Sequence, residues 1–199
     1  MKSSNGPFKL ATAAFLFLAA SFLFPATSRA QGLELSGGYA HATSDFGTDG
    51  FDLGVGYFFT PKLSVAAEYD GLWDTSRVGA FEFTTVGAIV SQSHLQNFLV
   101  GPRFYFSDYK VGKSHFIKPF GEVQFGVSHL RSRVQEGTTP SAFNSDSAFS
   151  WMLGGGVDYP ITPHWTARGN LDLLRTHLNA NAQSRARLVL GIAYTWGER

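Results

Sequence analysis

A regular alternation of large apolar residues with small or polar ones constrains this chain more than any other feature of its sequence. In the segment 50–59, GFDLGVGYFF, every odd-numbered position holds Phe, Leu, Val or Tyr, and the even-numbered positions hold Gly, Asp or Phe. The segments 63–73, 149–159 and 187–196 repeat this period of two. Since successive side chains of a β-strand point to opposite faces, the period predicts strands with one apolar face.

Four further segments alternate less regularly: 33–41, 95–106, 116–130 and 165–174. The sequence therefore predicts eight strands. Several of them have the roughly 9–11 residues that a tilted strand needs to cross a bilayer. After residue 30, no segment has the run of about 18 or more apolar residues that is typical of a transmembrane helix.

The connections between the predicted strands alternate between short and long. The short connections are residues 60–62, 107–115 and 160–164. The long ones, rich in Ser, Thr, Asn, Gly and Asp, are residues 42–49, 74–94, 131–147 and 175–185. Outer-membrane barrels have short periplasmic turns, longer outer loops and an even number of strands. We therefore predict an all-β, eight-stranded antiparallel up-and-down transmembrane β-barrel with both chain ends on the periplasmic side. Within the second long connection, residues 81–90, FEFTTVGAIV, predict strands that continue beyond the membrane as a hairpin.

A Thr-Pro pair recurs in two of the short connections, in FFTPKLSV around Pro61 and in PITPHWTA around Pro163. Shifting the chain by 102 residues aligns the two hairpins around these pairs and also brings Asp70 onto Asp172. Proline fixes φ near −65° and suits a tight turn, so we interpret the repeat as a marker of topology.

The composition of the two strand faces indicates which of them points outward. The less apolar face is mostly Gly and Ala with a few charges, and charged residues make up only 16% of the chain, against about 25% in soluble domains. This face suits the narrow interior of an eight-stranded barrel. A secreted, lipocalin-like soluble barrel would need the same face to meet water, and it is the alternative fold.

Aromatic residues, 15% of the chain, cluster near the predicted strand ends. Two aromatic belts that flank an aliphatic band are typical of lipid-facing barrels. The predicted girdle residues are Tyr57, Phe59, Trp73, Phe104, Phe106, Phe149, Trp151, Tyr159, Trp165, Tyr194 and Trp196.

Charged residues on the small-residue face predict an ion-pair network in the lumen, because an unpaired charge in a narrow interior is costly. The predicted members are Glu34, Glu68, Asp70, Arg103, Glu122, Arg168, Asp172 and Arg187, with Asp52 and Asp158 on the same face. Two interpretations stay open, a network that only fills the barrel and a gate for small solutes.

The first thirty residues have the layout of a secretory signal peptide. Lys2 and Lys9 precede the apolar run 10–24, and small residues stand three and one positions before Gln31. We expect a signal peptide over residues 1–30 and the barrel over residues 31–199. Without Lys2, Lys9 and Arg29, thirteen of the sixteen basic residues remain against fifteen acidic ones, a formal net charge of −2, which does not suggest a nucleic-acid partner. The chain has no cysteine, which excludes disulfides and thiol chemistry.

The chain resembles the eight-stranded outer-membrane barrels of the OmpA and OmpX type. The resemblance rests on LVGPRFYF at residues 99–106, the Thr-Pro turns and RLVLGIAYTW at residues 187–196. It implies an integral protein of the Gram-negative outer membrane, in contact with lipid and lipopolysaccharide and inserted by the barrel-assembly machinery. We expect no counterpart of the peptidoglycan-binding domain of OmpA and therefore no tether to the cell wall. The terminal aromatic residue that the machinery reads is displaced, since Gly197 and two further residues follow Trp196.

No catalytic, metal or cofactor site is predicted. The six histidines are scattered, and in the adjacent pairs Ser93-His94 and Ser128-His129 the two side chains of a strand point to opposite faces. We expect a structural or adhesion-like role through the outer loops, with Arg131 and Arg133 in loop 131–147 as candidates for contacts with a surface ligand or lipopolysaccharide phosphates. The alternatives are a minor solute pore, a lipid-A-modifying enzyme and the secreted soluble barrel.

Overall fold

The computed structural model describes residues 32–43, 48–78, 89–111, 115–136, 139–177 and 182–197. The predicted signal peptide, residues 1–30, and most of the predicted hairpin 81–90 lie outside these residues. The described strands are β1 (Gly32–Ala42), β2 (Thr48–Thr60), β3 (Leu63–Val78), β4 (Ile89–Tyr105), β5 (Tyr109–Val111), β6 (His115–Glu136), β7 (Thr139–Pro160), β8 (Trp165–Thr176) and β9 (Gln183–Trp196). Among the described residues, no helix has the length and hydropathy needed to cross a membrane.

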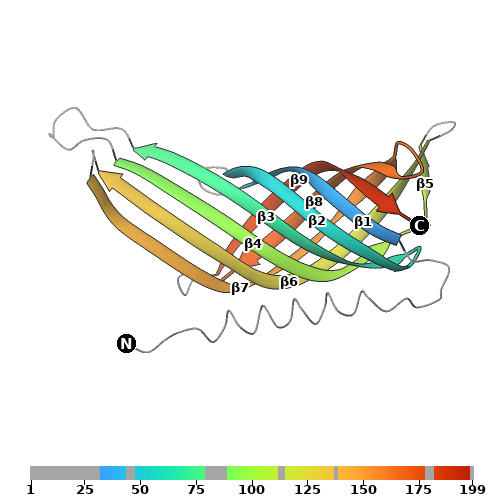
Figure 1. The fold of residues 1–199 in the computed structure, drawn as a ribbon, viewed down its shortest axis with the longest axis horizontal. Coiled ribbons are helices and arrows are strands. Elements are labelled where there is room, and N and C mark those ends of the chain that lie inside the picture. The colour runs from blue at the N-terminus through green and yellow to red at the C-terminus, as the bar shows by residue number, and fades with distance from the viewer. Residues whose placement is uncertain are drawn as a thin grey trace.

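Eight of these strands form a closed antiparallel barrel (Figure 1). The order around the sheet is β4-β3-β2-β1-β9-β8-β7-β6, and pairing of β4 with β6 closes it. Consecutive long strands are neighbours throughout, as an up-and-down topology requires, and β1 pairs with β9 to join the two chain ends. The predicted eight-stranded antiparallel barrel is confirmed.

Three predicted connections differ from the structure. In the predicted connection 74–94, β3 continues to Val78 and β4 begins at Ile89. The predicted connection 107–115 contains β5, a short strand that pairs only with the start of β6. The predicted loop 131–147 is wrong over most of its length, because β6 continues to Glu136 and β7 begins at Thr139. These segments alternate weakly in polarity, since beyond the membrane both faces of a strand meet water and neither needs to be apolar.

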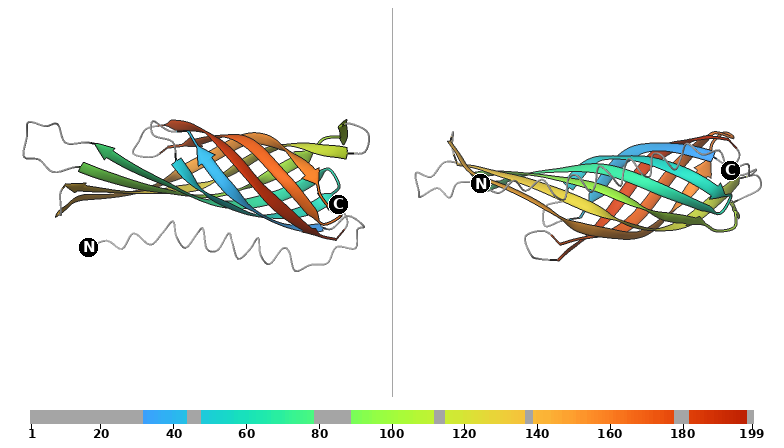
Figure 2. Two further views of the ribbon diagram at one scale, coloured as in Figure 1. Left: turned by 90° about the horizontal axis from the view of Figure 1, so that it is seen from above. Right: turned by 60° about the horizontal axis from the view of Figure 1, so that its bottom comes forward.

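Strands β3, β4, β6 and β7 run well past the other four (Figures 1 and 2). The β2–β3 ladder ends at the pair Asp49–Trp73 and the β7–β8 ladder at Ser150–Thr176, whereas β4 and β6 still pair at Ile89 and Glu136. We call this four-stranded sheet the extension. It consists of residues 74–78, 89–94, 129–136 and 139–149.

The two Thr-Pro turns lie at the barrel end opposite the extension, which we call the turn end. Each threonine hydroxyl accepts a hydrogen bond from a backbone N–H two residues later: Lys62 N donates to Thr60 Oγ1 at 3.3 Å, and His164 N donates to Thr162 Oγ1 at 3.3 Å. The same local turn chemistry accounts for the repeat in the sequence.

The barrel has its apolar face outside and its polar face inside. On the outer face of β9, Leu188, Leu190 and Ile192 are 43–56% exposed. Arg187, on the inner face of the same strand, is fully buried. Each strand thus places its large apolar residues on the outer wall and its small and charged residues in the lumen. This arrangement inverts a soluble core and suits a barrel surrounded by lipid.

Candidate functional site

Three arginines from three strands form the centre of the lumen. Arg103 of β4, Arg168 of β8 and Arg187 of β9 each occupy an inward position and are at most 6% exposed. A guanidinium has five N–H donors in a planar fork, so one arginine can hold several carboxylates at once. The lumen is therefore organised around these three cations.

Arg187 binds carboxylates from three other strands. Its Nη1 lies 2.5 Å from Asp70 Oδ2 and 3.2 Å from Asp52 Oδ2, and its Nη2 lies 2.9 Å from Glu68 Oε2 and 3.0 Å from Asp172 Oδ2. Asp52 belongs to β2, Asp70 and Glu68 to β3, and Asp172 to β8. One side chain thus links four strands through the interior.

Arg103 continues the network toward the turn end. Its Nη2 lies 2.6 Å from Glu68 Oε1 and 2.8 Å from Glu122 Oε2, and its Nη1 lies 3.3 Å from Glu34 Oε1. Glu68 therefore bridges Arg103 and Arg187 through its two oxygens.

Arg168 is the third arginine of the network. Its Nη1 lies 2.7 Å from Glu34 Oε1, its Nε 2.7 Å from Asp158 Oδ1, and its Nη2 donates to the Tyr105 hydroxyl at 3.0 Å. Because Glu34 contacts both Arg103 and Arg168, the ion pairs form one continuous chain along the lumen, Arg187–Glu68–Arg103–Glu34–Arg168.

The structure brings together all eight residues of the predicted network, with Asp52 and Asp158 beside them. The sequence prediction omitted a second, uncharged chain of hydrogen bonds: Asn97 Nδ2 donates to Asp70 Oδ1 at 2.5 Å, Ser128 Oγ donates to Asn97 Oδ1, and Ser150 Oγ donates to Ser128 Oγ at 2.6 Å. Asn97, Ser128 and Ser150 occupy the alternate strand positions that point inward, as the charged residues do. That alternation could have predicted them from the sequence.

Acidic groups outnumber basic ones among the buried residues. Seven carboxylates and three arginines are buried in the described lumen, a formal excess of four negative charges if every group is ionised. Burial without compensation is unfavourable for a charge, so protons or small cations from solvent must neutralise part of the excess. Two carboxylate oxygens, Glu122 Oε1 and Asp172 Oδ1, are buried without a hydrogen-bond partner.

Apolar side chains pack in the lumen on both sides of the charged network. At the turn end, Phe58, Tyr105 and Phe120 pack together, and the guanidinium carbons of Arg103 and Arg168 lie 4.8 and 5.3 Å from the Phe120 ring centre. Toward the extension, the inward residues form an aliphatic cluster of Ala40, Ala42, Leu72, Leu95 and Val189. A cavity inside the network, beside Asp52 and Glu68, has about 10 Å³, roughly the room of one water molecule.

The predicted girdle residues all lie on the outer face. Tyr57, Trp151 and Tyr194 are half-buried, and the other eight are exposed. Rings group at both ends of the barrel: Phe51 lies 5.4 Å from Trp73 between ring centres near the extension, and Tyr194 lies 4.9 Å from Trp165 at the turn end. The outer wall thus has aromatic side chains at two levels.

Basic side chains gather on the outward face of the extension. His94 of β4 and Arg131 of β6 are register partners, and Arg133 and His129 lie on the same face of β6. None of the described outward side chains of the extension carries a carboxylate. This face is therefore positively charged.

His129 of β6 lies beside a serine of β7. His129 Nδ1 lies 2.7 Å from Ser147 Oγ, and Arg131 Nε donates to His129 Nε2 at 3.0 Å. Arginine cannot accept a hydrogen bond, so Nε2 is the acceptor and Nδ1 carries the proton. His129 then donates to Ser147 and has no free lone pair to act as its base.

No group of three or more His, Cys, Asp and Glu in the described part of the chain has an arrangement that could hold a metal ion. His41 contacts Asp49 at 2.7 Å near the extension, without a serine in the same set of hydrogen bonds. Neither histidine arrangement forms a triad.

Comparisons with known proteins agree with this architecture. The family model of the outer membrane protein beta-barrel domain matches residues 10–195. None of the curated proteins matches the chain in sequence.

Solved structures with the same fold include Ail, the attachment invasion locus protein of Yersinia pestis, at 19% identity, with 83% of this chain and 99% of Ail covered and a TM-score of 0.56. A second structure of Ail, in complex with the heparin analogue sucrose octasulfate, has a TM-score of 0.57 at 16% identity, over 83% of this chain and 99% of that one. The outer membrane protein OprG of Pseudomonas aeruginosa has a TM-score of 0.50 at 13% identity, with 85% of this chain and 97% of OprG covered. At these identities the likeness concerns the fold.

Proposed function

Because the chain belongs to the outer membrane protein beta-barrel domain family, it is an integral outer-membrane protein, and we propose that it binds partners at the cell surface through the extension. In this family the short turns face the periplasm and the longer connections face outward. The turn end is then periplasmic, and the extension rises from the outer surface. The lipid-facing wall contacts phospholipid and lipopolysaccharide between the two.

The observation that carries the proposal is the sheet that continues beyond the barrel. Over residues 139–149, β7 pairs with β6 on one side and has no partner strand among the described residues on the other. An open edge presents unpaired N–H and C=O groups, to which an extended segment of a partner can add as a further strand. A barrel built only to span the membrane has no need of such an edge.

The basic face of the extension adds a second means of contact. Arg131 and Arg133 are exposed there beside His94. Guanidinium groups bind sulfate, phosphate and carboxylate in a bidentate manner. Anionic polysaccharides or acidic protein segments are therefore the partners that this face suits.

Adhesion of whole cells tests the proposal. A non-adherent Gram-negative host that expresses the chain should bind to immobilised extracellular-matrix proteins or heparin more than the same host without it. The double substitution Arg131→Ser with Arg133→Ser should reduce this binding several-fold, while Arg175→Ser, an exposed arginine outside the extension, should leave it unchanged. Equal adhesion with and without the chain, across the whole panel, would contradict the proposal.

We infer that the lumen network is structural and does not conduct solutes. Ion pairs span the interior, and apolar layers lie on both sides of them. The cavity beside Asp52 and Glu68 has room for about one water molecule. This packing opposes the pore as an alternative function.

We also infer that the barrel has no hydrolytic activity toward lipids. The hydrogen bond from Arg131 fixes the tautomer of His129 that cannot take a proton from Ser147. Expression of the chain should leave the lipid A mass spectrum unchanged.

Export and insertion complete the proposal. The features of residues 1–30 support a signal peptide that is cleaved after export through the general secretory pathway. Insertion by the barrel-assembly machinery is supported by Trp196 at the end of β9. N-terminal sequencing of the membrane-inserted protein should begin at Gln31.

A further inference from the structure

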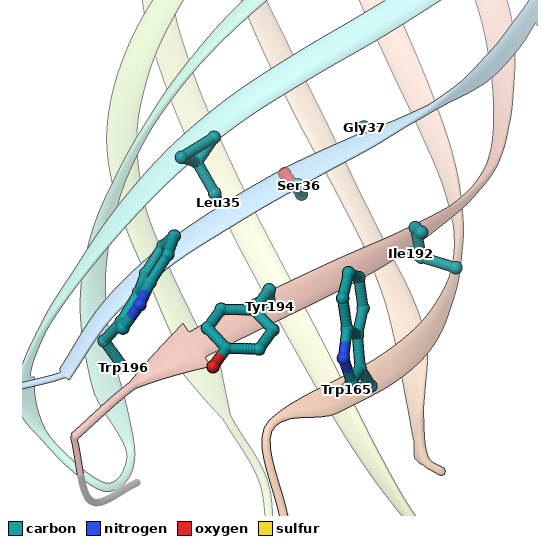
Figure 3. A pocket seen from close by; sticks show the side chains of 7 residues that line it. All are labelled: Leu35, Ser36, Gly37, Trp165, Ile192, Tyr194 and Trp196. Carbon is teal, nitrogen blue, oxygen red and sulfur yellow. The ribbon is translucent and has the colours of Figure 1, made fainter. Parts of the chain in front are cut away.

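The outer wall of the barrel is not smooth at its periplasmic end. An open groove of about 610 Å³ runs across β1, β9 and β8 there, and its walls are shown in Figure 3. The residues that line it are Leu35, Ser36, Gly37, Trp165, Ile192, Tyr194 and Trp196. No charged side chain contributes to the lining.

Gly37 creates the depression. It stands at an outward position of β1, opposite Ile192 of β9. The neighbouring outward residues of β1, Leu35 and Tyr39, have large side chains. A Cβ added at Gly37 would meet only Leu53 Cδ2 at 3.4 Å and Asp52 O at 3.8 Å, both ordinary contacts. By contrast, a Cβ at the next residue, Gly38, would lie 2.5 Å from the carbonyl oxygen of Leu190. Strand packing thus requires glycine at 38 but not at 37, where the missing side chain only leaves space on the outer surface.

Three aromatic rings form the wall nearest the periplasm. Tyr194 lies between Trp165 and Trp196, with ring centres 4.9 and 4.6 Å away and both contacts edge-on (Figure 3). Tryptophan and tyrosine with an apolar body and a polar tip favour the level of lipid headgroups. The groove therefore extends from the headgroup level at these rings to the hydrocarbon level at Leu35 and Ile192.

The position of the groove selects its occupant. It is continuous with the lipid-facing wall, so the molecules that reach it first are lipids of the periplasmic leaflet. A flexible acyl chain can follow a narrow concave surface, whereas the convex wall of a second barrel would bridge over it. Since the lining is apolar and uncharged, an acyl chain gains contacts there without desolvating a charge.

We propose that this groove is a binding site for one phospholipid of the periplasmic leaflet, with an acyl chain against Leu35, Gly37 and Ile192 and the headgroup beside Trp165, Tyr194 and Trp196. The site rests on the membrane placement of the barrel and is independent of the proposed surface interactions. Its ligand lies in the periplasmic leaflet, whereas the extension meets its partners outside the cell.

Tryptophan fluorescence in bilayers with brominated lipid tests this site. The chain has four tryptophans, and the background variant Trp73→Phe with Trp151→Phe leaves Trp165 and Trp196, both of which line the groove. The folded protein would be placed in phosphatidylcholine vesicles with increasing fractions of phosphatidylethanolamine brominated on its acyl chains. A bound lipid predicts quenching that saturates at low fractions of brominated lipid, above the level of random contact.

Gly37→Leu is the decisive variant, because its side chain fills the groove where the backbone leaves room. It should shift the half-saturating fraction of brominated lipid about fourfold to fifteenfold upward, as expected for the loss of contact with one or two methylene groups. Gly121→Leu is the matched control. Gly121 also faces outward near the periplasmic end, and it lies outside the groove. The nearest side chain to an added Cβ there would be the Phe106 ring, at 3.8 Å.

Both leucine variants should show the gel shift on heating that marks a folded barrel, which separates loss of the site from loss of folding. Quenching that rises in the same unsaturable way in the background protein, Gly37→Leu and Gly121→Leu would overturn the proposal. A cross-linked dimer that Gly37→Leu abolishes, with no change in quenching, would instead assign the groove to a second copy of the chain and would also overturn it.

Discussion

Arg187 Nη1 lies 2.5 Å from Asp70 Oδ2, although their strands are not neighbours. Arg187 belongs to β9 and Asp70 to β3, and both β1 and β2 stand between them in the sheet. The pair therefore crosses the lumen and holds together parts of the wall that no backbone ladder joins directly. Ion pairs of this kind make the interior a structural element of the barrel.

Replacement of Arg187 by Met should destabilise the barrel strongly. The substitution would leave Asp52, Glu68, Asp70 and Asp172 without the cation that they share, and removal of one partner of a buried ion pair costs about 3–5 kcal/mol. Equilibrium unfolding in urea, followed by tryptophan fluorescence of the protein in lipid vesicles, measures this difference. The control Arg175→Met removes an exposed arginine of β8 and should stay within about 0.5 kcal/mol of the wild type. Similar losses for both variants would show that the network is not a source of stability.

Replacement of a network acid should have a much smaller effect than replacement of an arginine. Because buried carboxylates outnumber arginines seven to three, Glu122→Gln removes part of an unfavourable excess. The amide can still accept from Arg103 through one oxygen. We expect a change within about 1 kcal/mol, against about 3–5 kcal/mol for Arg103→Met. If the two variants lose equal stability in the same urea titration, the excess negative charge is not a real feature of the folded barrel.

The period of two, the connection lengths and the composition of the two strand faces together predicted the fold and the residues of the lumen. Arg103 and Glu122, for example, are inward because of their parity, and a barrel of eight strands leaves no room for them to lie far apart. Which acid pairs with which arginine could not be predicted, because it depends on the stagger between strands. Glu68 bridges two arginines because its position on β3 lies within reach of both guanidinium groups.

The extension and the groove lay beyond the reach of sequence reasoning for different reasons. Beyond the membrane, residues 131–147 lose the apolar alternation that marks a strand. The sequence therefore predicts shorter strands than the observed β6 and β7. The groove depends on the pairing of β1 with β9, which brings Gly37 beside Ile192 from the far end of the chain. In the sequence, Gly37 is one of 22 glycines and has no distinguishing neighbour.

The barrel should not conduct ions. The chain of pairs through Arg103 and Glu68 spans the lumen between two apolar layers. Planar bilayers that contain the purified folded protein should stay silent, and Glu68→Ala should stay silent as well, because Arg103 and Arg187 retain other carboxylate partners. Reproducible, salt-dependent current steps that Glu68→Ala alters would instead establish an ion-pair gate.

A methyl group at Gly101 should disrupt the closure of the barrel. The β4–β6 ladder is interrupted at Gly101 and Pro102 and resumes in the same register at Arg103, since Pro102 cannot donate a hydrogen bond. At this gap the two backbones approach so closely that a Cβ on Gly101 would overlap the carbonyl oxygen of Val123, at 1.9 Å. We expect Gly101→Ala to lose about 1–3 kcal/mol or more, because only a backbone shift relieves the overlap. Gly121→Ala, whose Cβ would meet its neighbours only at ordinary contact distances of 3.8–3.9 Å, is the comparison and should fold normally. Heat-modifiable gel migration and urea unfolding of both proteins measure the difference, and an unchanged Gly101→Ala barrel would mean that β4 and β6 do not meet as closely as described.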